Sequence, residues 1–415
     1  MDKIDPYDFG FYYALSKDKQ LIDREDTSVI FYDLDVLKKR MTTIRELFPH
    51  SSLHTVAIKS NPLLGVLNEI CTYGFGLEAA SFEELLIAKH TGLEQQKMVF
   101  DSPVKTNAEI RCINDDLSSI YINANHIGEI ERYQEYDLKL GLRINPMNGI
   151  NSIKSMNVSS ETSKFGEPII NEEQILSACL KTSTISGLHV HVGSQIDHLN
   201  LAIEGISKVV RLANRINDAS KGKIKWIDIG GGFPVNYKGD SYDIDSYVQK
   251  IKVACPELFN GTYKLITEFG RYYHANAGWV VSTIESIKED TGHILTHVGA
   301  DMFLREVYNP DDWFHQLNIL DKDGKLKVDD LQKYSIGGPL CFGGDYIAKD
   351  RSLPKVEMGD SLVVSDVGAN SFALWSRHCS RSFPKVISYS SSQKGKDMKV
   401  IKKREKIEDI IKFWS

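Results

Sequence analysis

A lysine stands in an apolar, strand-forming stretch near the start of the chain. The stretch HTVAIKSNP predicts a short buried strand over residues 56–58, which Asn61 and Pro62 end. Lys59 is therefore expected at the carboxyl end of this strand. Burial disfavours the ammonium form, so we expect a neutral amine, which is the nucleophile that a Schiff base with an aldehyde requires. A lysine whose amine merely extends to solvent is the alternative.

Other polar residues end similar apolar runs further along the chain. They are Glu78, His191, Ser194, Gly230, Gly231, Gly232, Glu268, Gly270 and Arg271. Three consecutive glycines after a strand let backbone N–H groups approach a phosphate closely, although a tight turn would use them equally well. Ser194 and Arg271 could each donate to the same phosphate, with capping or surface roles as the alternatives.

Glu268 and His191 indicate what kind of ring such a phosphate would belong to. An unpaired carboxylate at the end of an apolar strand is costly, so Glu268 needs a partner that carries a proton or a positive charge. His191 could stack on a planar ligand, or it could be a hydrogen-bonded core histidine. Each signal is weak alone. A lysine for an aldehyde, a carboxylate for a pyridinium nitrogen and glycines with an arginine for a phosphate together predict pyridoxal 5'-phosphate.

A repeated alternation of strand and helix patterns must position these residues. From about residue 29, β-branched runs alternate with segments whose apolar residues recur every three or four positions. The runs are VIFYDL, TVAIKSN, GLEAAS, MVFDSP, SIYINAN, LKLGLRIN, GLHVHVGS, WIDIGGG and LITEFGR. This predicts an α/β fold over residues 29–275, a parallel (β/α)8 barrel whose site lies at the carboxyl ends of the strands. An open doubly wound sheet is the alternative.

The rest of the chain predicts a second domain. After residue 275, strand-like runs are separated by turn residues without long helices between them. We therefore expect residues 276–415, together with residues 1–28, to form a mainly antiparallel β domain, either a sandwich or a barrel.

The composition is that of a globular protein. Hydrophobic residues make up 42% and charged residues 26% of the 415 residues, which excludes disordered, collagen-like and membrane classes. The net charge of −6 argues against nucleic acid or an anionic membrane as a partner. The N-terminus lacks a signal-peptide pattern, so we expect a cytoplasmic protein. The six cysteines lack CxxC spacing, which predicts reduced thiols and no metal site.

A series of sequence blocks resembles the fold-type III pyridoxal-phosphate decarboxylases, which act on diaminopimelate, ornithine and related amino acids. In chain order the blocks are AIKSNP, GLEAASFEEL, SKFG, GLHVHVGSQ, IDIGGGFP, EFGRYYHANAG, GPLCFGGDYIAKD and GDSLVVSDVGA. The resemblance implies an alanine racemase-like barrel in which Lys59 binds the aldehyde, Glu268 holds the pyridine nitrogen and His191 packs on the ring. It also implies that the phosphate is bound by Ser194, Gly230, Gly231, Gly232, Gly270 and Arg271.

The resemblance has a further implication for the β domain. In the family, this domain lends a cysteine to the barrel of a second subunit. Cys341 in GPLCFGGD is therefore expected to be catalytic, as the proton donor to Cα, alongside Lys59 and His191. A homodimer with active sites at the subunit interface follows by analogy. Glu78 and Asn370 are expected as additional cofactor contacts.

The chain departs from the family where the far end of the substrate should bind. Relatives that act on a distal amine carry an acidic residue after the cysteine, but here the residue is Phe342. The family's GAY is GAN, so Asn370 replaces a tyrosine near the phosphate. Arg305 and Tyr308 resemble an arginine-tyrosine carboxylate clamp with a spacing one residue shorter. Asp345, in the cysteine block, is a further expected substrate contact.

A second group of changes adds positive charge. Arg377, His378 and Arg381 stand where the family's diaminopimelate enzymes have mostly small polar residues, and arginines suit carboxylates. These changes favour a substrate whose far end carries carboxylates, such as the citrylated diamino acids N-citrylornithine or citryl-diaminopropionate of siderophore biosynthesis. Pairing of Arg377 and Arg381 with surface acids is the alternative explanation.

Several other functions stay open. Diaminopimelate, lysine or ornithine decarboxylation keeps the chemistry and changes only the substrate. A racemase would need a base on each face of the cofactor, and the long GPLC block disfavours it. An inactive homologue that binds a partner protein is disfavoured because Lys59, Glu268 and Cys341 are all present.

Overall fold

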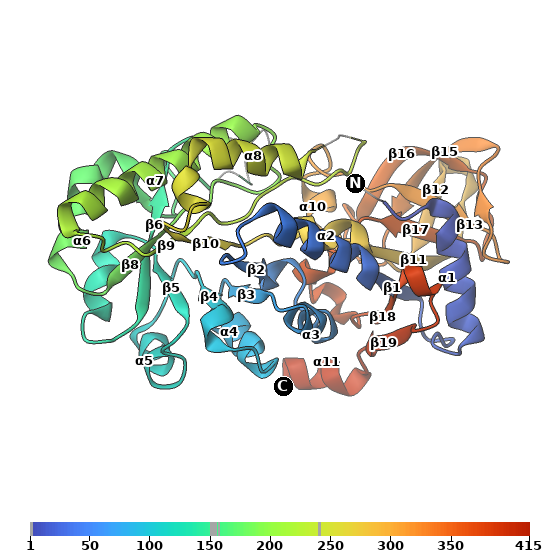
Figure 1. Ribbon diagram of the computed structural model, residues 1–415. Helices are drawn as coiled ribbons and strands as arrows, with labels where there is room; N and C mark the ends of the chain where they lie inside the picture. The colour runs from blue at the N-terminus through green and yellow to red at the C-terminus, as the bar shows by residue number, and fades with distance from the viewer. Residues whose placement is uncertain (1–2, 150–155, 157, 240–241) are drawn as a thin grey trace. The chain divides into compact units, whose positions relative to one another are not determined.

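The structure is a computed structural model that describes residues 3–149, 156, 158–239 and 242–415. The chain divides into two compact units (Figure 1). The barrel unit comprises Arg40–Val235 and Tyr242–Tyr272, and the β unit comprises Met1–Lys39, Asn236–Ser241 and Tyr273–Ser415.

In the described part of the barrel unit, eight parallel strands form a closed ring. They pair in the order β2-β3-β4-β5-β6-β8-β9-β10, and β10 pairs back to β2. The strands are β2 (Leu53–Ala57), β3 (Gly76–Ala79), β4 (Met98–Phe100), β5 (Tyr121–Ala124), β6 (Lys139–Asn145), β8 (Ile185–His189), β9 (Trp226–Asp228) and β10 (Lys264–Thr267), with the short β7 (Glu167–Pro168) beside β6. The predicted (β/α)8 barrel is confirmed, and the open doubly wound sheet is wrong.

Helix α2 (Leu34–Leu47) precedes β2, and helices follow most of the barrel strands. The helices that follow are α3 (Leu64–Thr72), α4 (Phe82–His90), α5 (Asn107–Asp116), α6 (Glu172–Lys181), α7 (Leu199–Ser220), α8 (Ile244–Ala254) and α9 (Arg271–His274), with 3-10 turns η1 (Ile58–Ser60), η2 (Gln95–Lys97), η3 (Ile127–Tyr133), η5 (Ile169–Asn171) and η6 (Pro256–Leu258). Ser81 caps α4 by accepting a hydrogen bond from the Glu84 N–H at 3.2 Å, and Thr106 and Glu109 form a capping box at α5. Such caps begin a helix a few residues after a strand and keep the strand end close to it.

The interior near the amino ends of the barrel strands is filled by side chains. Leu53, Val99, Tyr121, Trp226 and Ile266 form a buried cluster there. The glycine at position 187 makes room for the indole, because a Cβ atom at that position would lie 2.1 Å from Trp226. This packing leaves the carboxyl ends of the strands as the place where polar side chains can gather.

The β unit is built on a 10-stranded, mainly antiparallel sheet, as predicted. Its strands are β1 (Ser28–Asp33), β11 (Gly278–Lys288), β12 (His293–Thr296), β13 (Leu317–Leu320), β14 (Leu326–Lys327), β15 (Leu331–Gly337), β16 (Tyr346–Pro354), β17 (Ser361–Ser365), β18 (Lys385–Tyr389) and β19 (Lys399–Lys402). Within the described part of this sheet, only the β1–β18 and β12–β15 pairings are parallel. The helices are α1 (Pro6–Asp18), α10 (Leu304–Tyr308) and α11 (Ile407–Trp414), with 3-10 turns η7 (Ala275–Ala277), η8 (Glu289–Thr291), η9 (Phe372–Leu374), η10 (His378–Ser380) and η11 (Ser391–Gln393). Among all the helices described, none has the length and apolar character that crossing a membrane requires.

Strand β1 corrects one prediction. The sequence pattern makes the run VIFYDL the first barrel strand, but Ser28–Asp33 pairs with β11 and β18 in the β unit. All six residues of β1 are buried, and a strand buried on both faces gives the same continuous apolar run in either kind of sheet. The segment before β1 contributes α1, whose Phe9 and Tyr12 pack in the core of the β unit.

Candidate active site

Lys59 lies in η1, directly after β2 at the carboxyl end of the barrel. Its Nζ atom forms an ion pair with Oε2 of Glu78 on the neighbouring β3. The Lys59 side chain is about half exposed, less buried than the sequence predicts. Desolvation of the amine opposes its charge, but Glu78 and Glu268 outweigh this effect and raise the pKa of Lys59. The prediction of a neutral amine is therefore wrong for the chain by itself. The sequence did not reveal that carboxylates from two other strands act on this amine.

Glu268 follows β10 and is almost fully buried. Its Oε1 atom has no hydrogen-bond partner among the described residues. Burial, with the charges of Asp228 and Glu78, raises the pKa of Glu268 well above its usual range. The raised pKa favours the protonated carboxyl group, and Glu268 shares a side-chain hydrogen bond with Asp228. The unsatisfied Oε1 atom agrees with the need for a partner inferred from the sequence.

The glycine loop follows β9 and packs tightly against its neighbours. Gly230 and Gly232 have φ angles of +66° and +95°, which L-side chains rarely adopt. A Cβ atom on Gly231 would lie 2.5 Å from the carbonyl oxygen of Glu268. The Gly230 N–H donates to Asp228 Oδ1 at 2.8 Å, and the Gly231 N–H donates to a ring nitrogen of His191 at 3.1 Å. Two of the three amides are thus engaged within the barrel, and their contact with a phosphate stays a prediction.

The remaining predicted barrel residues come to the same end of the barrel. His191 lies after β8, and burial together with Arg143 lowers its pKa well below the usual value. Its ring is therefore neutral and flat, as stacking on a cofactor requires. A Cβ atom on Gly270 would lie 2.8 Å from the hydroxyl of Ser60, next to Lys59. Ser194 is half-buried in the loop that carries His191, and Arg271 is buried at the start of α9.

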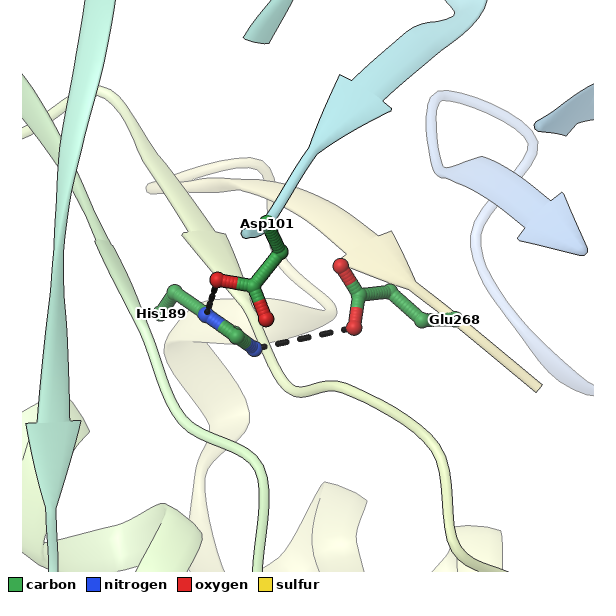
Figure 2. A group of neighbouring side chains, drawn as sticks. All are labelled: Asp101, His189 and Glu268. Atoms are coloured by element: carbon green, nitrogen blue, oxygen red, sulfur yellow. Dashed lines mark ion pairs between the residues drawn. The ribbon is translucent and has the colours of Figure 1, made fainter. Parts of the chain in front are cut away.

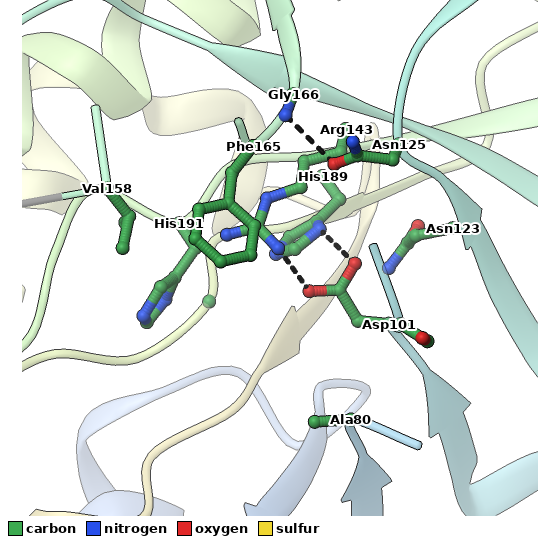
Figure 3. Close-up of polar contacts among 12 residues, drawn as sticks. Ala80, Asp101, Asn123, Asn125, Arg143, Val158, Phe165, Gly166, His189 and His191 are labelled. Carbon is green, nitrogen blue, oxygen red and sulfur yellow. Dashed lines mark hydrogen bonds and ion pairs between the residues drawn. The ribbon is translucent and has the colours of Figure 1, made fainter. Parts of the chain in front are cut away.

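Four charged or titratable side chains of this region were not singled out from the sequence. Asp101 follows β4, Arg143 lies in β6, and His189 and Asp228 end β8 and β9. Arg143 binds Asp101 Oδ2 at 2.7 Å, and Figure 3 shows Arg143 and His189 both directed at Asp101. Nδ1 of His189 lies 3.3 Å from Asp101 Oδ1, and its Nε2 lies 3.6 Å from Glu268 Oε2 (Figure 2).

A signal for part of this group was present. Asp101 in MVFDSP and Asp228 in WIDIGGG stand at or just after the end of an apolar run, so the rule that identified Lys59 could have found them. Arg143 and His189 lie within their runs, where alternation alone does not indicate which side chains point into the barrel.

The same cluster contains potential metal ligands. Ligand atoms of Asp101, His189 and Glu268 lie within 4.8 Å of one another. Burial would raise the pKa of Asp101, but Arg143 and His189 hold it well below its usual range. Because the Arg143 guanidinium already neutralises one of the two carboxyl groups in this cluster, it is better described as an ion-pair network than as a cation site.

The residues expected to bind the far end of the substrate lie in the β unit. Tyr308 in α10 stacks on Phe342, with ring centroids 5.8 Å apart and planes 17° apart. The Arg305 guanidinium lies 5.0 Å from the centre of the Trp313 ring. Cys341 is exposed and carries a free thiol. Asn370 is half-buried with a φ of +56°, a conformation that asparagine tolerates better than most residues.

Asp345 has hydrogen-bond partners within the β unit. Asp345 accepts hydrogen bonds from the N–H groups of Ala300 at 2.6 Å and Leu340 at 2.7 Å, so both of its oxygens hold loops. Each oxygen can accept a second hydrogen bond, so the expected contact of Asp345 with a substrate stays a prediction.

The added positive charges are also engaged. Arg377 makes two hydrogen bonds to Glu405, at 2.6 and 2.7 Å, and Arg381 binds Asp301 at 3.0 Å. The alternative that these arginines pair with acids is therefore the arrangement found. His378 is exposed.

The barrel unit thus has the features of an enzyme that uses pyridoxal phosphate. Its carboxyl end presents a lysine for an aldehyde, a buried carboxyl with an unsatisfied oxygen for a ring nitrogen, and a glycine loop near a buried arginine for a phosphate. These residues fit the cofactor.

The chain belongs to the pyridoxal-dependent decarboxylases, because the pyridoxal binding domain of that family matches residues 34–275. It is 28% identical to a diaminopimelate decarboxylase of Aquifex aeolicus, over 95% of this chain and 93% of the relative. It is 26% identical to one of Helicobacter pylori, over 94% and 96%. A crystal structure of diaminopimelate decarboxylase from Helicobacter pylori complexed with L-lysine has the same fold, with a TM-score of 0.85, 24% identity and coverage of 97% of this chain and 99% of that one.

These findings confirm the predicted class and cofactor. The protein is a pyridoxal-phosphate-dependent carboxy-lyase that decarboxylates an amino acid. Which amino acid it decarboxylates is a separate question.

Proposed function

We propose that this enzyme decarboxylates an amino acid with a second carboxylate at its far end, and that diaminopimelate is the first candidate. The observation that carries this proposal is the similarity, over nearly the whole chain, to proteins named diaminopimelate decarboxylase. Arg305 and Tyr308 in FLREVY support it as the expected contacts of the distal carboxylate.

The barrel residues take the following roles in this proposal. Pyridoxal phosphate, when bound, supplies the electron sink for the carbanion that remains when CO₂ leaves. The Lys59 amine binds its aldehyde, and Glu78 takes the proton that the amine must lose, since the two groups are already in contact. Glu268 faces the ring nitrogen and His191 the ring face. The phosphate contacts are Ser194, Gly230, Gly231, Gly232, Gly270 and Arg271, with Asn370 as a further candidate.

We also propose a homodimer in which each β unit lends Cys341 to the barrel of the other subunit, as the proton donor to Cα. The exposed free thiol of Cys341 supports this arrangement. Mixing the inactive variants Lys59→Ala and Cys341→Ala tests it. Random exchange of subunits creates one intact site in each mixed dimer, so about a quarter of the wild-type activity should return. No recovery after exchange, checked with differently tagged subunits, would show that the two residues act within one subunit.

A second candidate substrate is a citrylated diamino acid such as N-citrylornithine, in siderophore biosynthesis. Phe342 favours it, because this residue replaces an acid expected beside a distal ammonium and stacks on Tyr308 instead. A substrate whose distal amine is acylated needs no counter-charge there. Arg377 and Arg381 lend it no support, because acids of the β unit engage both.

Measuring CO₂ release from the reconstituted enzyme separates these substrates. Diaminopimelate, lysine, ornithine and N-citrylornithine are supplied in parallel at equal concentrations. The highest kcat/KM with diaminopimelate supports the first candidate, and turnover of N-citrylornithine alone supports the second. Turnover of only lysine or ornithine would refute both. A protein that binds pyridoxal phosphate but releases no CO₂ from any of the four would favour the inactive homologue.

A further inference from the structure

His189 is enclosed by charged side chains from neighbouring strands. Its ring is fully buried, and its two nitrogens face Asp101 and Glu268 at 3.3 and 3.6 Å (Figure 2). Arg143 binds the other oxygen of Asp101 (Figure 3). The ring also interacts electrostatically with Glu78, Asp228 and His191. A histidine between two carboxyl groups, one of which faces the expected ring nitrogen, calls for a role.

The hydrogen-bonding capacity of the three groups fixes how they can fit together. Asp101 is ionised, because Arg143 and His189 outweigh its burial and lower its pKa, so it can only accept. The Nδ1 atom of His189 must therefore carry a proton. The Nε2 atom on the other side of the ring faces Glu268 Oε2, so His189 links the fixed Asp101 to the carboxyl group of Glu268. The 3.6 Å separation exceeds a hydrogen bond, but such contacts often tighten only when a site is filled.

We propose that His189 is a positioning residue whose Nε2 atom holds the Glu268 carboxyl group in the orientation that meets the pyridine ring nitrogen. Asp101, which Arg143 binds, fixes the other side of the imidazole ring. The inference rests on the proposed role of Glu268 and adds His189 and Asp101 to it.

His54 shows what a buried histidine of this barrel does without such neighbours. It lies in β2, where its Nδ1 is 2.9 Å from the hydroxyl of Thr267. Burial, with a smaller effect of Arg45, lowers the pKa of His54 to about 4. It is an ordinary neutral core histidine, and His54→Gln is therefore a matched control for the loss of a buried imidazole from the same barrel.

The test compares two ligands that differ at one atom. The full-length protein is stripped of cofactor, and the Kd values of pyridoxal phosphate and of its 1-deaza analogue, in which the ring nitrogen is a C–H group, are measured by fluorescence titration. His189→Gln should weaken binding of pyridoxal phosphate by about tenfold to a hundredfold, the effect of a lost hydrogen bond to a charged group. Binding of the deaza analogue should change by less than about threefold, because it has no nitrogen for Glu268 to meet. Asp101→Asn should likewise weaken the binding of pyridoxal phosphate more than that of the deaza analogue. His54→Gln should change the two Kd values by the same factor.

If His189 had only a structural role, its loss would weaken the binding of both ligands equally. That result for His189→Gln and Asp101→Asn would overturn the inference. Glu268→Gln separates this failure from a failure of the underlying assignment. If Glu268→Gln discriminates between the ligands while the other two variants do not, Glu268 meets the nitrogen and His189 has no part in it. If none of these three variants discriminates between the ligands, then neither the contact of Glu268 with the ring nitrogen nor the role of His189 is correct. Circular dichroism of each cofactor-free variant shows whether it folds. If His189→Gln does not fold, the comparison of the two ligands is made with Asp101→Asn.

Discussion

Removing the Lys59 amine should destabilise the cofactor-free barrel by an amount that depends on pH. In Lys59→Met, Glu78 stays buried but loses its ion-pair partner. Loss of one partner from a buried pair costs roughly 3–5 kcal/mol. Because the Lys59 side chain is 49% exposed, solvent screens the pair, and we expect about 2 kcal/mol near pH 8.

The sign of the pH dependence follows from Glu78. Burial raises its pKa, and Lys59 opposes the rise. Without the lysine the pKa rises further, so the folded variant binds a proton that the unfolded chain releases. The free energy of unfolding of the variant must then fall as the pH rises from about 5 to 8, by at most about 1.4 kcal/mol per pH unit. The difference from the wild type is largest at high pH and narrows as the pH falls.

Calorimetry of the cofactor-free protein measures this difference. The barrel transition of Lys59→Met should lie about 4–8 °C below that of the wild type near pH 8, since 1 kcal/mol shifts a domain of this size by roughly 2–4 °C. The double variant Lys59→Met/Glu78→Gln lacks the buried carboxyl and should lose the extra pH dependence. A difference that stays constant from about pH 5.5 to 8, or a double variant that behaves like the single one, would refute the ion pair.

Three further substitutions test the β unit. Arg377→Met should change kcat/KM by less than about threefold and lower Tm by about 1–3 °C, because its guanidinium is engaged by Glu405; a tenfold rise in KM would contradict this pairing. Cys341→Ala should keep the absorbance of the bound cofactor while slowing turnover by roughly 10²–10⁴-fold, and an unaltered rate would remove its role as proton donor. Phe342→Glu should raise kcat/KM for ornithine by about tenfold by restoring a counter-charge for the distal ammonium, and steady-state kinetics without that gain would place the ammonium elsewhere.

The barrel could be predicted because its strands are buried on both faces and appear as continuous apolar runs. The same property explains the error at Ser28–Asp33, where a fully buried strand belongs to the other unit. Hydrophobicity reports that a strand is covered and does not identify its neighbours. Pairing with β11, some 250 residues later, is a tertiary choice that no local pattern encodes.

The site was predictable as far as it follows the strand ends. Lys59, Glu78 and Glu268 were found because the carboxyl ends of parallel strands meet at one end of a barrel. Their charge states were not, since the pKa of Lys59 depends on carboxylates of β3 and the loop after β10. Arg377 illustrates the same limit in the β unit. Its partner Glu405 is 28 residues away in sequence, and no spacing rule relates them.

The balance of charge at the barrel's carboxyl end affects how Glu268 can ionise. Four buried carboxyl groups gather there: Lys59 pairs with Glu78, Arg143 pairs with Asp101, and Asp228 accepts from the glycine loop. Glu78, Asp228 and Glu268 each also have one oxygen without a hydrogen-bond partner among the described residues, and burial, with the charges of Asp228 and Glu78, raises the pKa of Glu268. Its ionisation therefore requires a nearby positive charge, and a protonated ring nitrogen supplies one. The site thus favours a ring that can carry a proton over an uncharged ring of the same shape, and a histidine that holds the Glu268 carboxyl group toward the ring nitrogen would strengthen that preference.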